Sequence, residues 1–203
     1  MLFQVVSKKL RNIQGTLQHS NYFKSDSIQT TSNGVAIKTK SLPLQKNCIM
    51  ENYVEEKVAL AVSYFKGGYN CAQSVFMAFA DDFKLDKELA ARFSASFGGG
   101  IGRMREVCGT VCGMAMCASF ISPANNPADH NARTQNYALT QEFAEKFRME
   151  NGDIVCRRLL GLPDATKESP EPSQRTPEFY KKRPCVEYVA CATRIVAEKI
   201  LQY

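Results

Sequence analysis

The sequence predicts an all-α protein, a compact bundle of about six or seven helices that follows a disordered N-terminal extension. Three observations favour this fold class. Apolar residues recur at spacings of three and four from residue 51 to the end of the chain. Residues that start and stop helices divide this part into helix-length segments. Strand-like pieces such as Val35-Ala36-Ile37 occur only within the first 49 residues.

Residues 1–49 differ in composition from the rest of the chain and form the predicted extension. They are rich in Ser, Thr, Asn, Gln and Lys and lack periodicity, so we expect them to be disordered or weakly ordered. The whole net charge of +6 falls here, where seven basic residues stand against Asp26 alone. Residues 50–203 form the predicted helical, cysteine-rich domain, and their neutrality gives no support for nucleic-acid binding. Because the periodic pattern starts near Met50, one hypothesis is that the native chain begins there, which N-terminal sequencing tests.

The first two predicted helices lie on either side of a glycine pair. The first begins near Glu51 and ends at Gly67-Gly68, and its apolar face consists of Val54, Val58, Ala61, Val62 and Phe65. Asn70 is a favourable N-cap for the second, which runs from Cys71 to about Phe83.

Five further helices complete the predicted bundle. They run from an Asp86 cap to before Gly98, from about Cys108 to Ile121, from about Asp129 to Glu150, from an Asp153 cap to Leu160, and from about Cys185 to Leu201. The residues expected to be buried in the longest of them are Tyr137, Leu139, Phe143, Ala144 and Phe147. Residues 163–184 hold five prolines and are predicted to form a loop with at most a short turn at Glu178-Phe179.

The absence of two sequence signals bears on where the protein acts. No run of 18 apolar residues is present, so no membrane span and no membrane partner are expected. No apolar secretory signal begins the sequence, which favours a cytoplasmic location. Cysteines in that compartment are usually reduced, metal-bound or catalytic rather than paired in disulfides.

Four of the eight cysteines fall near predicted helix N-termini, namely Cys71, Cys108, Cys156 and Cys185. The unpaired N–H groups and positive dipole of a helix start favour the thiolate, which is the metal-binding and nucleophilic form. Arg103 and Arg105, just before Cys108, add positive charge there. The alternative is that each cysteine packs as a small apolar residue in the core.

The other cysteines differ in their expected roles. Cys112 lies one helical turn after Cys108 on the same face, a spacing that suits two ligands of one metal or the two thiols of a redox pair. Cys117 and Cys191 are expected in the core, and Cys48 belongs to the extension. No CxxC motif is present, so neither a thioredoxin-type motif nor a zinc ribbon is predicted.

The glycine-rich run Gly98-Gly99-Gly100-Ile101-Gly102 precedes Cys108. It follows no strand and lacks a Gly-Lys-Ser/Thr ending, so phosphate binding is disfavoured. Its backbone freedom instead lets the loop pass close to a cofactor or to a neighbouring helix. Gly99, Gly100 and Gly109 are therefore assigned to cofactor binding.

Four separated motifs resemble those of the C_GCAxxG_C_C family, whose members are regarded as redox-active. The motifs are Gly68–Val75, Phe97–Gly102 with Cys108–Gly113, Cys156–Gly161, and Cys185 in the last helix. The resemblance spans residues 51–203 and maps the four signature cysteines to Cys71, Cys108, Cys156 and Cys185. Thr110 stands where the family often has a small residue such as Ala, and Cys112 is an additional thiol within the motif.

The resemblance implies redox chemistry. A related helical module occurs in split-Soret-type cytochromes, where an iron–sulfur centre is associated with it. The chain has no CxxCH motif, so covalent haem attachment is not expected.

Three functions remain open at this point. The first is a protein of electron transfer or redox sensing, in which the four cysteines bind an iron–sulfur cluster, most plausibly of the 2Fe-2S type. The second is a thiol–disulfide oxidoreductase in which Cys108 is a nucleophile of low pKa and Cys112 is a candidate second thiol. The third is an interaction module with structural zinc or with no metal. The expected partner is an unidentified redox protein, and a homodimer is one option.

Overall fold

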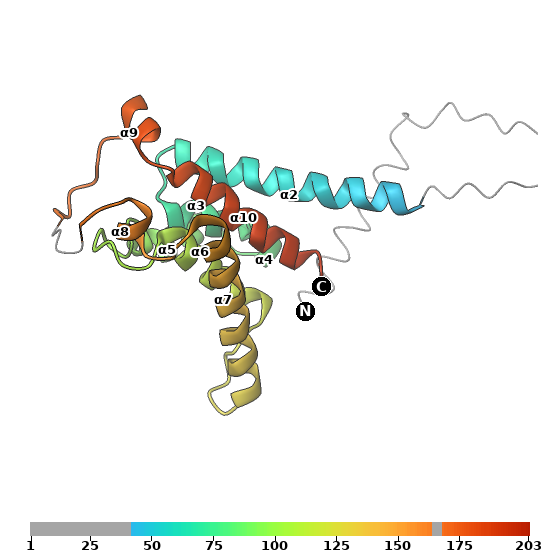
Figure 1. Ribbon diagram of the computed structural model, residues 1–203. Coiled ribbons are helices and arrows are strands. Elements are labelled where there is room, and N and C mark those ends of the chain that lie inside the picture. Colours follow the sequence, from blue (N-terminus) through green and yellow to red (C-terminus); the bar gives the residue numbers. More distant parts are fainter. Residues whose placement is uncertain (1–41, 164–167) are drawn as a thin grey trace, which may run out of the picture. The chain divides into compact units, whose positions relative to one another are not determined.

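The computed structural model describes residues 42–163 and 168–203, with side chains from residue 47 onward. The helices of this part are α2 (Leu42–Lys66), α3 (Cys71–Met77), α4 (Ala80–Phe83), α5 (Lys87–Ser94), the 3₁₀ turn η2 (Ala95–Phe97), α6 (Gly109–Ile121), α7 (His130–Asn151), α8 (Cys156–Leu159), α9 (Pro177–Lys182) and α10 (Cys185–Ile200) (Figure 1). No strand occurs among them, and the sole β-bridge joins Val107 to Val155. The all-α prediction is confirmed for the described residues.

The chain divides into two units, residues 1–49 and 50–203, and the second holds the bundle. The first predicted helix begins earlier than expected, at Leu42 instead of Glu51, so residues 42–49 are helical. Pro43 lies in the first turn, where its missing N–H breaks no hydrogen bond, and good helix formers follow it. Residues 1–41, which carry most of the predicted disorder, lie outside the described residues.

The core of the second unit forms where α3 packs against α5 and α6, and α10 packs against α6 and α7. The largest fully buried side chains include Phe65, Phe79, Phe143, Phe147 and Met114. Phe120 extends this core, because its ring stacks on Phe83 with 4.8 Å between centroids. No helix of the described part is both long enough and apolar enough to span a membrane.

The predicted helix over residues 71–83 is interrupted. It ends at Met77 and resumes as α4 at Ala80. The interruption coincides with a tertiary contact, because the buried Lys57 ammonium donates a 3.0 Å hydrogen bond to the Ala78 carbonyl and pairs with Asp82. The Ala78 carbonyl thus accepts a hydrogen bond from a side chain of α2 instead of one from the next helical turn.

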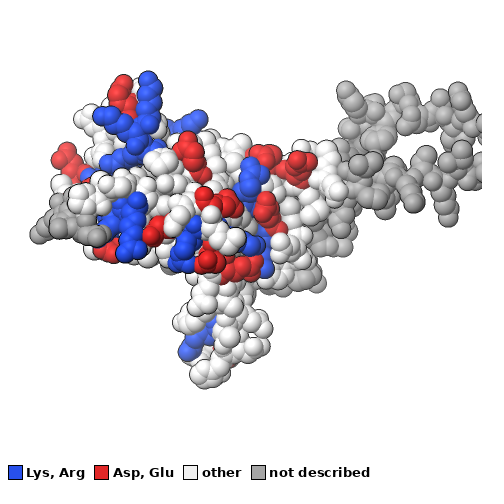
Figure 2. All heavy atoms as spheres, in the orientation of Figure 1, with Lys and Arg blue, Asp and Glu red and all other residues white. Residues whose placement is uncertain are grey.

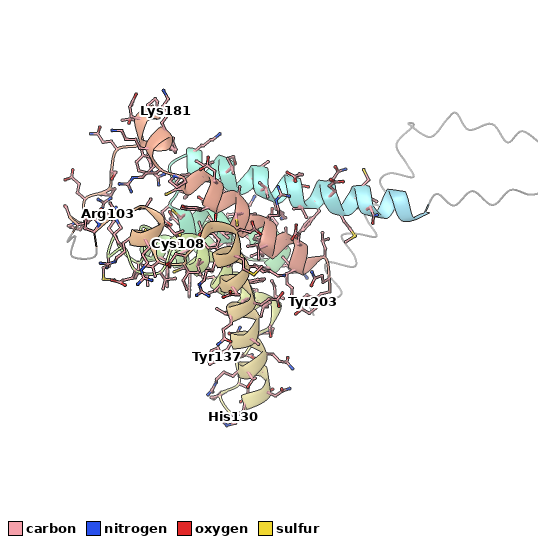
Figure 3. All side chains as sticks on the ribbon, viewed as in Figure 1. Arg103, Cys108, His130, Tyr137, Lys181 and Tyr203 are labelled. Carbon is pink, nitrogen blue, oxygen red and sulfur yellow. The ribbon has the colours of Figure 1, made fainter. Side chains whose placement is uncertain are left out.

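α7 departs from the predicted pattern in its first half. Leu139, Phe143 and Phe147 are buried as predicted, but Ala144 is only partly buried and Tyr137 is 59% exposed. The first half of α7 projects from the bundle with the loop before it, so no element of the described part of the chain covers Tyr137 or the exposed His130 (Figures 1 and 3).

Candidate functional site

A cavity of about 420 Å³ brings together the four cysteines that the motifs singled out. Cys71, Cys108, Cys156 and Cys185 all line it. Cys71, Cys156 and Cys185 are the first residues of α3, α8 and α10, and Cys108 is the N-cap of α6. The four helix starts converge on one cavity although they are far apart in the sequence.

A network of side-chain caps fixes the start of α3 and hence Cys71. The Asn70 side chain accepts a 3.0 Å hydrogen bond from the Gln73 amide, and the Gln73 side chain accepts one of 2.9 Å from the Asn70 amide. Asn70 also donates to the Ala95 carbonyl at 2.7 Å, and Gln73 donates to that of Ala91 at 3.0 Å. Asn70, the N-cap predicted from the sequence, therefore also links α3 to the α5–η2 segment by a hydrogen bond.

The glycine-rich loop approaches the cysteines too closely for a side chain. A Cβ atom on Gly100 would lie 2.7 Å from Cβ of Cys156, and one on Gly109 would lie 3.2 Å from Cβ of Cys71. Gly99, Gly100 and Gly109 all line the cavity. The backbone φ angle is positive at five consecutive residues, 99–103, including the β-branched Ile101 at +59°, which marks local strain beside the site.

Backbone hydrogen bonds hold the segments of Cys108 and Cys156 side by side. The Cys108 amide donates to the Ile154 carbonyl at 2.8 Å, and the Cys156 amide donates to the Glu106 carbonyl at 2.6 Å. Asp153, predicted to cap α8, instead accepts from the Ile154 and Val155 amides at 2.7 and 2.8 Å, and Val155 is the N-cap. The carboxylate therefore shapes the turn that leads into Cys156.

The thiols of Cys71 and Cys185 shift each other's pKa. A hydrogen bond from Cys71 to the Cys185 sulfur lowers the pKa of Cys185 and raises that of Cys71 well above its usual range. The positive charges of Arg183, Arg175 and Arg105 lower the pKa of Cys185 further, against the opposing effect of burial. Cys185 is therefore the site cysteine that ionises most readily.

The low pKa expected at Cys108 is not found. Burial raises the pKa of Cys108 to about 12, although its sulfur lies 3.1 Å from Oγ1 of Thr110. Burial also raises the pKa of Cys156, and Arg105 partly offsets it. Position at a helix start thus did not decide the pKa, because loss of hydration outweighs the helix dipole at a buried sulfur.

The remaining cysteines lie outside the cavity. Cys112 is half-buried, its sulfur faces the Val107 carbonyl at 3.9 Å, and burial raises its pKa to about 11. Cys117 is fully buried, as expected. Cys191 is half-buried between Asn151 and Glu150 and is not a core residue, and Cys48 is exposed.

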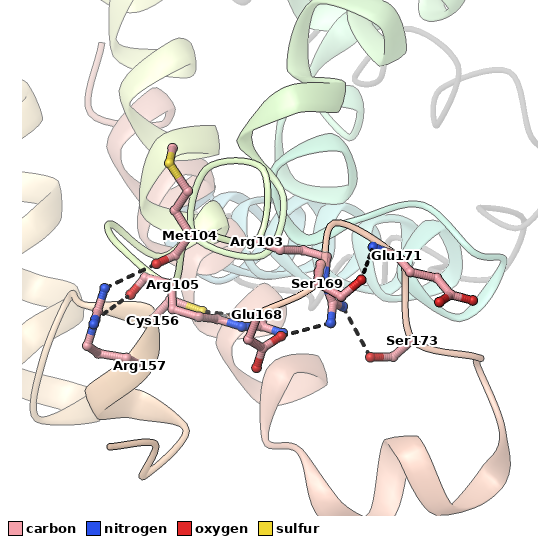
Figure 4. Close-up of polar contacts among 9 residues, drawn as sticks. All are labelled: Arg103, Met104, Arg105, Cys156, Arg157, Glu168, Ser169, Glu171 and Ser173. Atoms are coloured by element: carbon pink, nitrogen blue, oxygen red, sulfur yellow. Dashed lines mark hydrogen bonds and ion pairs between the residues drawn. The ribbon is translucent and has the colours of Figure 1, made fainter. Parts of the chain in front are cut away.

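Four arginines also line the cavity: Arg103, Arg105, Arg175 and Arg183. Arg103 and Arg105 share one carboxylate, Glu168, whose pKa they lower (Figure 4). Arg105 is only 3% exposed, and its Nη1 lies 4.0 Å from the Cys156 sulfur. Arg157 binds the backbone of the same loop, donating to the Met104 carbonyl at 3.1 Å.

Sequence reasoning missed much of this arginine face. Arg103 and Arg105 were noted only for their charge near Cys108, whereas Arg105 contacts Cys156. Arg175, Arg183 and Glu168 lie in the proline-rich segment, where no periodicity signals a role. The sequence shows only that these three charged residues lie in the segment that leads to Cys185.

The donor set suits soft metal chemistry, since four thiols share one cavity. Among the described residues, no group of three or more His, Cys, Asp or Glu side chains is arranged to hold a single metal ion. The thiols thus match an iron–sulfur centre in donor type and in their common cavity. Their arrangement is not that of a preformed single-ion site.

Comparisons with known proteins agree with these motifs. The family model described as "Putative redox-active protein (C_GCAxxG_C_C)" matches residues 69–199, which include all four cavity cysteines. No curated protein and no solved structure matches the chain. Because the family model covers more than half of the sequence, the chain belongs to the C_GCAxxG_C_C family.

Proposed function

We propose that this protein carries electrons or senses redox state through an iron–sulfur centre held by Cys71, Cys108, Cys156 and Cys185. The observation that carries the proposal is the convergence of these four thiols, from four helix starts, on one cavity. Thiolates are the ligands of such centres, and four cysteines satisfy either a two-iron or a four-iron type. A volume of about 420 Å³ is also far more than a single ion requires, which favours a cluster over zinc.

The surrounding residues suit this role. When bound, the centre would supply one-electron exchange at a potential set by burial and by hydrogen bonds to sulfur. Cys108 and Cys156 are buried, which excludes water from that side of the cavity. The Arg105 guanidinium faces Cys156 and the Thr110 hydroxyl faces Cys108, so both sulfurs have a donor group beside them.

Anaerobic reconstitution tests the proposal. Metal-free protein is treated with iron and sulfide, and its visible spectrum and its iron and sulfide content are measured. We expect a coloured protein with stoichiometric iron, and a large loss of iron in Cys156→Ser. Cys191→Ser is the matched control, because Cys191 is half-buried but lies outside the cavity. A wild-type protein that stays colourless and free of iron would contradict the proposal.

A second candidate function is thiol–disulfide exchange, favoured by the presence of Cys71 and Cys185 in one cavity and by the lowered pKa of Cys185. In this scheme the Cys185 thiolate attacks a partner disulfide, forms a mixed disulfide and releases one thiolate. Cys71 then attacks the Cys185 sulfur, so that a Cys71–Cys185 disulfide forms, the second partner thiol leaves, and two electrons have passed to the partner. The nucleophile is Cys185 here, in place of the expected Cys108, because Cys108 has the higher pKa.

Thiol mapping separates the two functions. Mass spectrometry after mild oxidation by a small disulfide is expected to show a Cys71–Cys185 bond if exchange is the function. The second candidate would be supported if the wild type catalyses reduction of a disulfide substrate and this activity survives in Cys108→Ser but not in Cys185→Ser. The first candidate would be supported if both variants lose iron binding and the wild type shows no such disulfide reduction.

A further inference from the structure

We infer that the arginine face of the cavity binds the carboxylate or phosphate group of a small organic anion. The binding site consists of Arg175 and Arg183, which lie beside Cys185. This binding does not depend on the proposed function, since it requires neither a metal nor a disulfide. If the anion is the molecule that exchanges electrons, that role rests on the proposed function.

The first argument is a surplus of positive charge. Of the four arginines that line the cavity, Arg103 is fully engaged, because it donates to Glu168, Ser169 and Ser173 at 2.8, 2.8 and 3.2 Å (Figure 4). Arg105 also pairs with Glu168. A single carboxylate therefore pairs with two guanidinium groups. The charge of Arg183 also helps to lower the pKa of Glu168, but neither Arg183 nor Arg175 forms an ion pair with a carboxylate among the described residues.

The second argument is the way in which these two arginines are held. The Arg175 guanidinium lies between the rings of Phe65 and Phe179, at 4.5 and 4.8 Å from their centroids. Its Nη2 donates to the Tyr69 carbonyl at 3.2 Å, but its Nη1 is buried without a hydrogen-bond partner in the described part of the chain. A donor buried in this way is costly unless a ligand satisfies it.

Arg183 complements Arg175 from the end of α9. Its guanidinium lies over the Phe179 ring, which Arg175 also contacts, at 5.1 Å from the centroid, and within the described residues it makes no hydrogen bond or ion pair. Stacking on aromatic rings orients a planar guanidinium and leaves its N–H edge available for bidentate binding of an oxyanion. Phe179 thus positions both groups at one cavity wall.

The third argument concerns the size and lining of the cavity. A volume of about 420 Å³ falls within the ~300–1,000 Å³ typical of small-molecule sites. Apolar side chains form part of the wall, including Leu159, Leu160, Pro170 and Tyr188. The ligand is therefore expected to join an anionic head to an apolar body. Basic side chains gather around α9 on the face shown in Figure 2, and they attract anions toward this end of the unit.

Calorimetric titration of the reduced, metal-free full chain at low salt tests the inference. The probes are benzoate and phenyl phosphate, with benzamide and phenol as their neutral counterparts. We expect at least one anion to bind at least tenfold more tightly than its neutral counterpart, and the preferred anion identifies the head group. Binding of the neutral probes with equal affinity, or of no probe at all, would overturn the inference.

Variants assign the binding to the proposed residues. Arg183→Gln and Arg175→Gln are each expected to weaken anion binding at least tenfold, whereas Arg133→Gln, on the projecting part of α7, leaves it unchanged. Because Arg175 also packs against two rings, its replacement could unfold the protein, so thermal melting of each variant is followed by circular dichroism. If Arg175→Gln is unfolded, the test rests on Arg183→Gln. Unchanged affinity in a folded Arg183→Gln would sink the proposal. Iron loading is measured separately, so the result is independent of the redox proposal.

Discussion

Arg105 lies against Cys156, with 4.0 Å between the guanidinium Nη1 and the sulfur, and both side chains are buried. Arg105 reaches this position from a loop residue with a φ of +61°, and its carbonyl accepts a 3.0 Å hydrogen bond from the Arg157 amide. The strained loop therefore places a fixed positive charge beside one of the four sulfurs.

Replacement of Arg105 should make the Cys156 thiol harder to ionise. The Arg105 charge opposes the effect of burial, so Arg105→Gln raises the pKa of Cys156 further and slows its alkylation at pH 8 to 9. Arg105→Lys keeps the charge and should retain most of the rate. Alkylation is followed by mass spectrometry on the metal-free protein, and equal rates in wild type and Arg105→Gln would refute the assigned contact.

The stability of the metal-free protein should fall in alkaline solution. A thiol whose pKa is raised by folding stabilises the fold fully below the pKa of the unfolded chain, and this contribution is lost as the pH rises toward the folded pKa. For Cys108, with a folded pKa of about 12, the loss is about 1.4 kcal/mol per pH unit between roughly 9 and 12. Urea unfolding at pH 7, 9 and 10 measures the slope, which should be shallower in Cys108→Ser.

A methyl group at Gly100 should destabilise the site more than one at Gly161. Both glycines have positive φ, +71° and +64°, so Ala at either costs about 1–2 kcal/mol in backbone conformation. Only at Gly100 does the new Cβ also clash with Cys156, whereas nothing lies within 4 Å at Gly161. Urea unfolding should give a much lower free energy of unfolding for Gly100→Ala than for Gly161→Ala, and iron loading should fall in Gly100→Ala alone. Equal stability of the two variants would mean that the close approach is relaxed in solution.

The ion pair between Lys57 and Asp82 should matter far more than a comparable surface pair. Both partners are almost fully buried, so Asp82→Asn leaves the Lys57 ammonium without its counter-charge, at a cost of about 3–5 kcal/mol. Asp81→Asn is the control, because the Lys87–Asp81 pair is exposed and contributes at most about 1 kcal/mol. Chemical unfolding of both variants gives the comparison. A small effect of Asp82→Asn would contradict the role assigned to the buried ion pair.

Local signals in the sequence identified most helix starts. Asn70 and Asp86 each cap a helix as predicted, because an Asn or Asp oxygen can satisfy the first amides whatever surrounds it. The break at Ala78 could not be predicted, since it coincides with a hydrogen bond from Lys57, 21 residues earlier. Likewise, the helical spacing predicted that Tyr137 is buried, but Tyr137 is exposed because the first half of α7 projects from the bundle.

The candidate site was predictable only in part. The motifs named the four cysteines, and the convergence of their helix starts on one cavity is a property of the fold. The pKa order was not accessible, because it depends on burial at Cys108 and on the Cys71–Cys185 contact. The contact of Arg175 with Phe179 could not be predicted for a similar reason, since it depends on the fold of a segment that has no periodic pattern. The basic run that ends at Arg183 likewise gives no sign of the contact that Arg183 makes with the same ring.

The start points of α3, α6, α8 and α10 supply one sulfur each to the same cavity, and this has a consequence for turnover of the protein. Any ligand that bonds to all four sulfurs would cross-link the chain, because it would close three loops at once and restrict the unfolded ensemble. Loss of the ligand would make the glycine-rich and proline-rich segments more accessible to proteases. Cellular lifetime would then report whether the sulfurs are occupied.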